Sequence, residues 1–298
     1  MQAATVSHSS HESTRWEASP FDLEAYLERI GYRGALTPSR ETLRALQRAH
    51  LAAVPFENLD IVTGGEIRLD LANLEDKLVR RRRGGYCHEQ NLLFATVLDR
   101  LGFQVMGRGA RMLVGEPAHQ ITAVAHTLLV VRVAGRDWLV DVGVGYVGPR
   151  EPVPIEAGVE VRHGRWEYRL ERSPIGLWLL RHRRHDGWFN IYQFGDAPYY
   201  RADAENHNYH VSHHPDSPFV RRIVAQHNGA TERLGLTDLE LTVVRPGASP
   251  ERRELEVAEL PDVLRESFGL TLSSEQEGNL LRRAETLAEV SSGERRDV

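Results

Sequence analysis

The sequence lacks several features that define whole classes of protein. It holds one cysteine in 298 residues, so no disulfide can form within the chain. No apolar run approaches the ~18 residues that a membrane helix needs, which argues against a membrane protein. The formal net charge is −5, which argues against a nucleic-acid partner because phosphate contacts favour a basic surface. With 41% hydrophobic and 27% charged residues and no internal repeat, the sequence is typical of a globular protein.

The N-terminal segment Met1–Trp16 also lacks a basic start followed by an apolar core. It is polar and rich in Ser and His, so we predict no signal peptide. The absence of disulfides fits a reducing compartment. We therefore expect a cytoplasmic protein, either a monomer or a homodimer.

The first hundred or so residues have helical patterns. Ser19–Asp22 reads as a helix start, with Ser19 as N-cap and Pro20 at the first helical position, and Gly31 ends that helix. Thr37-Pro38 starts a second helix. The segment Cys87–Leu101 is a third, with apolar residues at helical spacing and Gly102 as a C-cap.

From about Val105 the sequence is β-branched and leucine-rich, which predicts antiparallel strands. The expected strands are Ile121–Val133, Trp138–Val144, Trp166–Leu170 and Trp178–His182, with a tight turn at Ala134–Asp137 and a loop at Gly148–Gly158.

The last third is mixed. We expect an irregular segment at Asp203–Pro218, strands at Pro218–Ala225 and Leu239–Val244, helices at Pro261–Phe268 and from Ser273 to about Val290, and a frayed tail at Ser291–Val298. Ser274 and Glu277 resemble a capping box for the last helix.

Cys87, the single cysteine, follows Arg83-Gly84-Gly85-Tyr86 at a predicted helix start. A helix N-terminus offers free N–H groups and a partial positive charge, which stabilise a thiolate and could bind an oxyanion. A lone cysteine is more often a buried apolar residue, so both interpretations stand.

A thiol nucleophile needs a base, and the chain has 14 histidines. His88 points about 100° away around the helix and is a poor partner. His126 opens an apolar strand, and Asp141 lies in another apolar run, where an unpaired carboxylate is costly. If the hairpin turn is centred on Gly135-Arg136, however, His126 and Asp141 are offset by about 13 Å along the strand. A solvated strand edge remains the alternative.

Several stretches, taken together, resemble the arylamine N-acetyltransferase family. They are Val54–Leu59, Arg83–Cys87, His126 before its apolar strand, Asp141–Gly145 and, more loosely, Asn208–Phe219. They keep the family's order along the chain.

The resemblance implies an α+β fold with a cysteine-protease-like core. A helical bundle (residues 1–104), an antiparallel β-barrel (105–212) and an α/β lid (213–298) are expected. It implies a catalytic triad of Cys87, His126 and Asp141. It also implies ping-pong transfer of an acetyl group from acetyl-CoA to arylamines, arylhydrazines or N-hydroxyarylamines, hence a role in xenobiotic metabolism.

Residues implied to contact amine or CoA are Phe56, Tyr86, Val144, Gly145, Ser212 and His213. Phe56 could equally be ordinary core packing. His88, Val144 and the pair Ser212-His213 depart from the family's usual residues, so the acceptor and donor preferences stay open. The alternatives are an amide synthase that closes macrolactams and a non-catalytic CoA-binding relative.

The sequence has two further clusters of basic side chains. His207, His210, His213 and His214 could ligate a metal, but their spacing is not that of a structural zinc site, so we predict no metal. The basic run Arg80–Arg83 could meet CoA phosphates, but a solvated helix face is the commoner reading.

Overall fold

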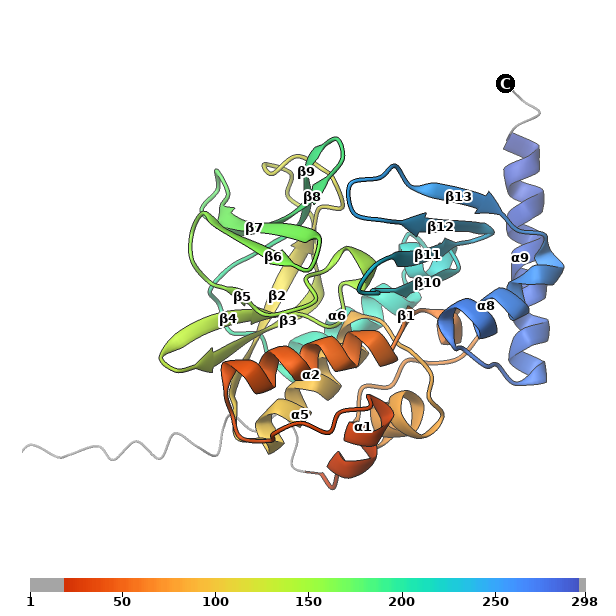
Figure 1. Cartoon of the computed structure of the whole chain (residues 1–298). Helices are drawn as coiled ribbons and strands as arrows, with labels where there is room; N and C mark the ends of the chain where they lie inside the picture. Colours follow the sequence, from red (N-terminus) through yellow and green to blue (C-terminus); the bar gives the residue numbers. More distant parts are fainter. Residues whose placement is uncertain (1–18, 295–298) are drawn as a thin grey trace, which may run out of the picture.

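The computed structural model describes residues 19–294. The segment Met1–Trp16, for which we predict no signal peptide, lies outside this range. The described chain has an α+β fold. A helical region, a large antiparallel sheet and a smaller sheet flanked by two helices follow one another along the sequence (Figure 1). Within the described residues, no helix has the length and apolar character to cross a membrane.

The helical region contains α1 (Leu23–Arg29), α2 (Arg40–Ala53), α3 (Leu59–Val62), α4 (Leu71–Glu75), the π-helical turn η1 (Asp76–Arg80) and α5 (Cys87–Arg100). The first two helices start later than predicted. The Asp22 and Ser39 side chains, rather than Ser19 and Thr37, accept the first free N–H groups of α1 and α2. The third predicted helix is confirmed as α5, and Gly102 follows it with φ +84°.

The large sheet has eight antiparallel strands that curl toward a barrel, with β5 and β6 as its edges (Figure 1). Their order is β5-β4-β3-β2-β9-β8-β7-β6. The strands are β2 (Gln104–Met112), β3 (Val124–Val133), β4 (Arg136–Val140), β5 (Val153–Pro154), β6 (Val159–His163), β7 (Trp166–Arg172), β8 (Trp178–Arg184) and β9 (Gly187–Phe194). Both predicted hairpins, β3–β4 and β7–β8, are confirmed. The short turn η2 (Gly145–Val147) follows β4.

The last region is built on a five-stranded sheet of order β1-β10-β11-β12-β13. Its edge strand β1 (Phe56–Glu57) comes from the helical region and pairs with β10. The sheet therefore joins the helical region to the C-terminal region. The other elements are α6 (Arg201–His213), α7 (Pro218–Arg221), β10 (Val224–His227), β11 (Arg233–Thr237), β12 (Glu240–Val244), β13 (Glu251–Glu254), η3 (Val257–Glu259), α8 (Leu260–Phe268) and α9 (Ser274–Glu294).

Two predictions in this region are wrong. The segment predicted as irregular is mostly helix α6, because Asp203 accepts the Tyr200 N–H at 2.8 Å and Ala204 and Val211 pack into the core. The strand predicted from Pro218 begins only at Val224. The residues before it form α7, which has Ser217 as N-cap and Pro218 in its first turn.

The ends of the last two helices also test the sequence patterns. Helix α8 ends as predicted, with Gly269 in the left-handed conformation. The capping box of α9 is formed by Ser273 and Gln276, one residue before the predicted pair, and the helix continues to Glu294, so the predicted fraying from Ser291 is wrong within the described residues.

Candidate active site

Cys87 is the first residue of α5 and is 3% exposed. Its helix passes beneath β3, and the Cys87 Sγ lies 3.9 Å from the carbonyl oxygen of Ala125 on that strand. The N–H groups of the first helical turn have no partners within the helix. The thiol therefore lies where positive partial charge is concentrated.

Two glycines bring the backbone into position before Cys87. A Cβ on Gly84 would lie 2.3 Å from the Pro55 carbonyl oxygen, and one on Gly85 would lie 2.8 Å from a carboxylate oxygen of Glu89. Both positions therefore exclude a side chain. Glu89 in turn accepts the Tyr86 N–H at 3.0 Å, which caps α5 directly before the thiol.

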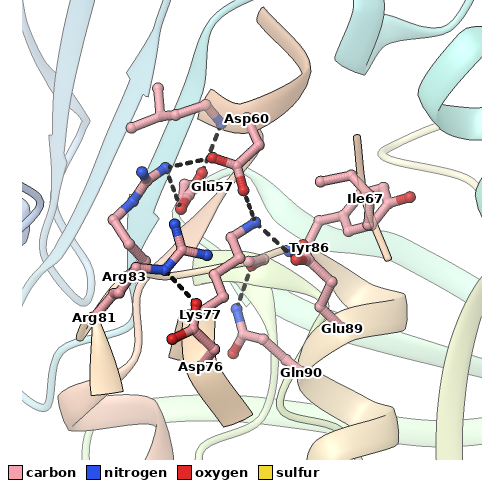
Figure 2. Close-up of polar contacts among 12 residues, drawn as sticks. Glu57, Asp60, Ile67, Asp76, Lys77, Arg81, Arg83, Tyr86, Glu89 and Gln90 are labelled. Atoms are coloured by element: carbon pink, nitrogen blue, oxygen red, sulfur yellow. Dashed lines mark hydrogen bonds and ion pairs between the residues drawn. The ribbon is translucent and has the colours of Figure 1, made fainter. Parts of the chain in front are cut away.

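A buried network of charges anchors this turn (Figure 2). Lys77 Nζ lies 2.7 Å from Glu89 and 2.8 Å from Asp60. Arg83 lies 3.0 Å from Glu57 and 3.2 Å from Asp60. Burial lowers the pKa of the Lys77 amine, but the three carboxylates outweigh burial and raise it above its usual value. The network ties the helix start to β1 and α3.

We expect Lys77→Met to lower the free energy of unfolding by about 3–5 kcal/mol, because it leaves buried carboxylates without their cation. Urea unfolding followed by circular dichroism measures the change. Arg81→Met is the matched control: its ion pair with Asp76 is 51% exposed on both sides, so it should cost less than about 1 kcal/mol. Equal effects of the two substitutions would contradict the role of the network.

His126 and Asp141 form a buried pair. His126 Nε2 lies 2.7 Å from Asp141 Oδ2, and the two side chains are 3% and 0% exposed. The pairing depends on where the hairpin turns. The turn is centred on Ala134-Gly135, with φ of +51° and +76°, one residue before the position assumed above.

This shift changes the geometry predicted from spacing. In the observed register Asp141 would face Leu128, two residues or about 7 Å from His126 rather than about 13 Å. Strand β4 also ends at Val140, so Asp141 begins a loop and can turn toward β3. The predicted offset of about 13 Å is therefore wrong, and a two-residue hairpin does bring the two side chains together.

Asn91 holds Asp141 in place and was not identified from the sequence. Its Nδ2 donates to Asp141 Oδ1 at 2.9 Å and to the Thr127 carbonyl, and its Oδ1 accepts the Val142 N–H. Asp141 Oδ1 also accepts the Gly143 N–H at 2.9 Å. Asn91 follows Cys87 by four residues on α5, and this i, i+4 spacing places both on one helix face, which is the signal that could have identified it.

The electrostatics favour a thiolate beside an imidazolium. Burial alone would raise the pKa of Cys87, but His88 and His126 lower it to about 5. Burial alone would lower the pKa of His126, but Asp141 and Cys87 raise it to about 10. Between these values the thiolate and the imidazolium are the favoured forms.

His88 is a second imidazole next to the thiol, although helical spacing made it a poor partner. It is fully buried, its Nδ1 lies 2.7 Å from Thr127 Oγ1, and its ring meets that of Tyr86 edge-on. Its Nε2 has no hydrogen-bond partner among the described residues. Thr127 follows His126 on β3, so the hydrogen bond ties His88 to the strand that carries His126.

We expect His88→Phe to raise the pKa of the Cys87 thiol by about one unit, because it removes a group that favours the thiolate. The pH dependence of iodoacetamide alkylation measures this, and the single cysteine makes the signal unambiguous. His185→Phe, in the exposed turn between β8 and β9, is the control. An unchanged midpoint in His88→Phe would disprove the effect.

The six residues expected to contact substrate lie in two groups. Phe56 is close to Gly145, which has φ +77° and lies against the Gln226 side chain, and Val144 adjoins them. Tyr86 is fully buried and its hydroxyl bonds Asn208 of α6. Ser212 Oγ donates back to the Asn208 carbonyl at 2.7 Å, while His213 is exposed and stacks on Tyr209.

The four-histidine cluster and the basic run Arg80–Arg83 lie in different parts of the structure. His207 bonds Tyr199 at 2.7 Å, and the rings of His210 and His214 are tilted, with their centroids 4.6 Å apart. Within residues 19–294 no group of three or more His, Cys, Asp or Glu side chains is arranged to hold a metal ion. The basic run is not one solvated helix face, because Arg83 is 2% exposed and belongs to the buried network.

Comparisons with known proteins agree on one family. Residues 39–277 match the family model described as N-acetyltransferase. The arylamine N-acetyltransferase of Escherichia coli K12 is 34% identical over 258 residues, which are 86% of this chain and 91% of that protein. The structure of the arylamine N-acetyltransferase from Mycobacterium abscessus superposes with a TM-score of 0.87 at 36% identity, covering 92% of this chain and 98% of that one. The Mycobacterium marinum arylamine N-acetyltransferase in complex with CoA gives a TM-score of 0.84 at 35% identity, covering 89% and 99%.

Proposed function

The chain belongs to the arylamine N-acetyltransferase family, and we propose from this premise that Cys87, His126 and Asp141 are its catalytic triad. The protein is an enzyme that transfers an acetyl group from acetyl-CoA to arylamines. The observation that carries the triad is the buried 2.7 Å contact between His126 and Asp141 beside a thiol at a helix N-terminus.

The first half-reaction loads the enzyme. The Cys87 thiolate attacks the carbonyl carbon of acetyl-CoA, and the carbonyl π electrons move to oxygen. The tetrahedral oxyanion collapses, the C–S bond to CoA breaks, and the CoA thiolate leaves with the proton of the His126 imidazolium. The products are acetyl-Cys87, free CoA and a neutral His126.

The second half-reaction unloads it. The amine nitrogen attacks the acetyl-Cys87 carbonyl, and neutral His126 takes a proton from that nitrogen. When the intermediate collapses, the Cys87 thiolate leaves and the thiolate–imidazolium pair is restored. An aromatic amine suits this step because it is largely unprotonated near neutral pH.

Asp141 and the helix start support both steps. Asp141 accepts from His126 Nε2, which fixes the tautomer and stabilises the imidazolium. The first-turn N–H groups of α5 would stabilise the oxyanion.

The acceptor range extends, in our proposal, to arylhydrazines and N-hydroxyarylamines. Phe56, Val144 and Gly145 would form one wall of the acyl and amine pocket. Tyr86, Ser212 and His213 would lie on the α6 side. The closeness of Phe56 to Gly145, at the start of the turn after β4, supports the first group, and the hydrogen bond from the Tyr86 hydroxyl to Asn208 of α6 supports the second.

The test is a two-step incubation. Acetyl-CoA alone should release CoA and add the mass of one acetyl group to Cys87, and an arylhydrazine added later should remove it. Cys87→Ala is the control and should gain no mass. Labelling at another residue would disprove the triad.

The alternative functions predict other outcomes of the same assay. An amide synthase would be loaded by a carrier-bound long-chain thioester and not by acetyl-CoA. A non-catalytic relative would bind CoA without acetylation of Cys87.

The proposal also covers the structural units, the location and the oligomeric state of the protein. The units are residues 1–104, 105–212 and 213–298, the second border falling in the last turn of α6. We place the protein in the cytoplasm as a monomer or homodimer, which gel filtration with light scattering would distinguish.

A further inference from the structure

A pocket of about 250 Å³ lies where the large sheet leaves its two edge strands unpaired with each other. Residues at both edge strands, β5 and β6, line the pocket. The start of α2 covers the same edge and lies below β4 and β5 in the view of Figure 1. Cys87, His126 and Asp141 do not line the pocket, so the proposed reaction does not account for it.

The polar part of the lining is mostly basic. It consists of Arg40 and Arg44 at the start of α2, Arg162 and His163 on β6, and one acid, Glu151. The charge of Glu151 is already compensated, because Arg44 lies 2.7 Å from its carboxylate. The pocket therefore has an excess of positive charge, which favours an anionic ligand.

Arg40 is the cation of this lining that lacks a counter-ion. Arg44 and Arg162 each pair with a glutamate, whereas Arg40 makes no ion pair with any residue of the described range. Its side chain is exposed, and its guanidinium lies over the Trp138 ring, 4.9 Å from the ring centre. The ring contact orients the planar guanidinium, which can bind a carboxylate through two parallel hydrogen bonds.

Two buried side chains of the lining also lack hydrogen-bond partners. Trp138 is 5% exposed and His163 is 6% exposed. Neither Trp138 Nε1 nor His163 Nδ1 has a partner among the described residues. A buried polar nitrogen without a partner is costly. A carboxylate at the inner end of the pocket would supply the acceptor that the indole N–H lacks.

His163 also reports on the electrostatic potential of this region. Burial, and after it the nearby Arg44, Arg233 and Arg150, lower the pKa of His163 to about 3. The imidazole is therefore neutral near pH 7, and the arginines around it outweigh the acids. An anion bound beside His163 would offset this positive potential.

The remaining part of the lining is apolar and rigid. Trp138, Pro152, Pro154 and Val161 supply it. Proline and indole rings have few rotatable bonds, so they form fixed walls. Ring-shaped side chains pack well against another flat ring. Shape and charge together therefore favour an aromatic ring that carries a carboxylate.

We propose that this pocket binds a small aromatic carboxylate. The carboxylate accepts hydrogen bonds from the Arg40 guanidinium and from the buried Trp138 N–H, and the ring packs against Pro152, Pro154 and Val161. The site is separate from acyl transfer and does not rest on the proposed function.

Benzoate is the probe, and calorimetry on the whole protein measures its binding. Arg40→Gln should weaken the binding about tenfold, because it removes a charge-assisted hydrogen bond. Arg136→Gln is the matched control. It removes an exposed cation that lies 5.8 Å from the centre of the same Trp138 ring but does not line the pocket, so it should bind benzoate as the wild type does. No binding by the wild type, or equal binding by the two variants, would overturn the site.

Alkylation of Cys87 separates this pocket from the active site. Binding of benzoate should survive treatment with iodoacetamide, because the thiol lies outside the pocket. Loss of binding after alkylation would place benzoate at the thiol and overturn the proposal.

Two related probes test the class of ligand. Benzamide keeps the ring without the charge, and acetate keeps the charge without the ring. Each should bind at least about tenfold more weakly than benzoate, since each lacks one of the two contributions. Binding of either probe as tight as that of benzoate would contradict recognition of an aromatic carboxylate.

Discussion

Asp141→Asn should lower kcat/KM for acetyl transfer by about 10⁴-fold and leave the fold intact. The carboxylate accepts a hydrogen bond from His126 Nε2, which leaves Nδ1 free to exchange a proton with the thiol. An amide can donate at the same position and thereby favour the opposite tautomer. It also no longer stabilises the imidazolium by charge, so both half-reactions slow.

The pH profile gives this prediction a second readout. In the wild type the thiolate is lost as pH falls through about 5, and the imidazolium is lost as pH rises through about 10. Without the Asp141 charge the pKa of His126 falls, so the upper limb of the profile should move to lower pH. Asp137→Asn, in an exposed ion pair with Arg132, is the control. Activity of Asp141→Asn within tenfold of the wild type would rule out the triad.

Gly143→Ala should lower kcat/KM by about 100-fold, a loss typical of a shift of about 1 Å in an active site. The new Cβ would lie 2.6 Å from the Cys87 Cα and 2.9 Å from the Cys87 carbonyl oxygen. Both are backbone atoms, so no side-chain rotation can relieve the clash. Either the start of α5 or the loop after β4 must move, and each carries a member of the proposed triad.

Gly278→Ala on α9 is the matched control, because its nearest neighbour would be the end of the flexible Arg282 side chain at 3.5 Å. Kinetics and the alkylation rate of Cys87 should both separate the two variants, and urea unfolding reports on folding. If Gly143→Ala behaved like Gly278→Ala in all three measurements, the close packing of Gly143 on the nucleophile would have no catalytic consequence.

Local features were predicted well because they depend on residues close together in the sequence. Two glycines before an apolar helical pattern predicted a thiol at a helix N-terminus, and α5 begins at Cys87. Gly269 and the preceding periodicity fixed the end of α8. The missed helix α6 shows the limit of such patterns: its surface is polar, and only packing of Ala204 and Val211 on the helical region reveals its inner face.

The pairing of His126 with Asp141 could not be derived from spacing. A shift of the turn by one residue moved Asp141 about 7 Å along the strand, and the end of β4 at Val140 freed it to turn. The family resemblance had implied the pair. The contact itself depends on strand register and on Asn91, which lies on a helix far from both in sequence.

The sequence by itself therefore determined one candidate nucleophile, the local structure around it and the family to which the chain belongs. The tertiary structure decided which of 14 histidines meets the thiol region and Asp141, that Lys77 and Arg83 join three buried carboxylates, and that α2 and two edge strands line one pocket. The physical reason is range. Helix caps and glycine turns involve neighbours within a few residues, whereas ion pairs and pockets require distant segments to pack at a fixed register.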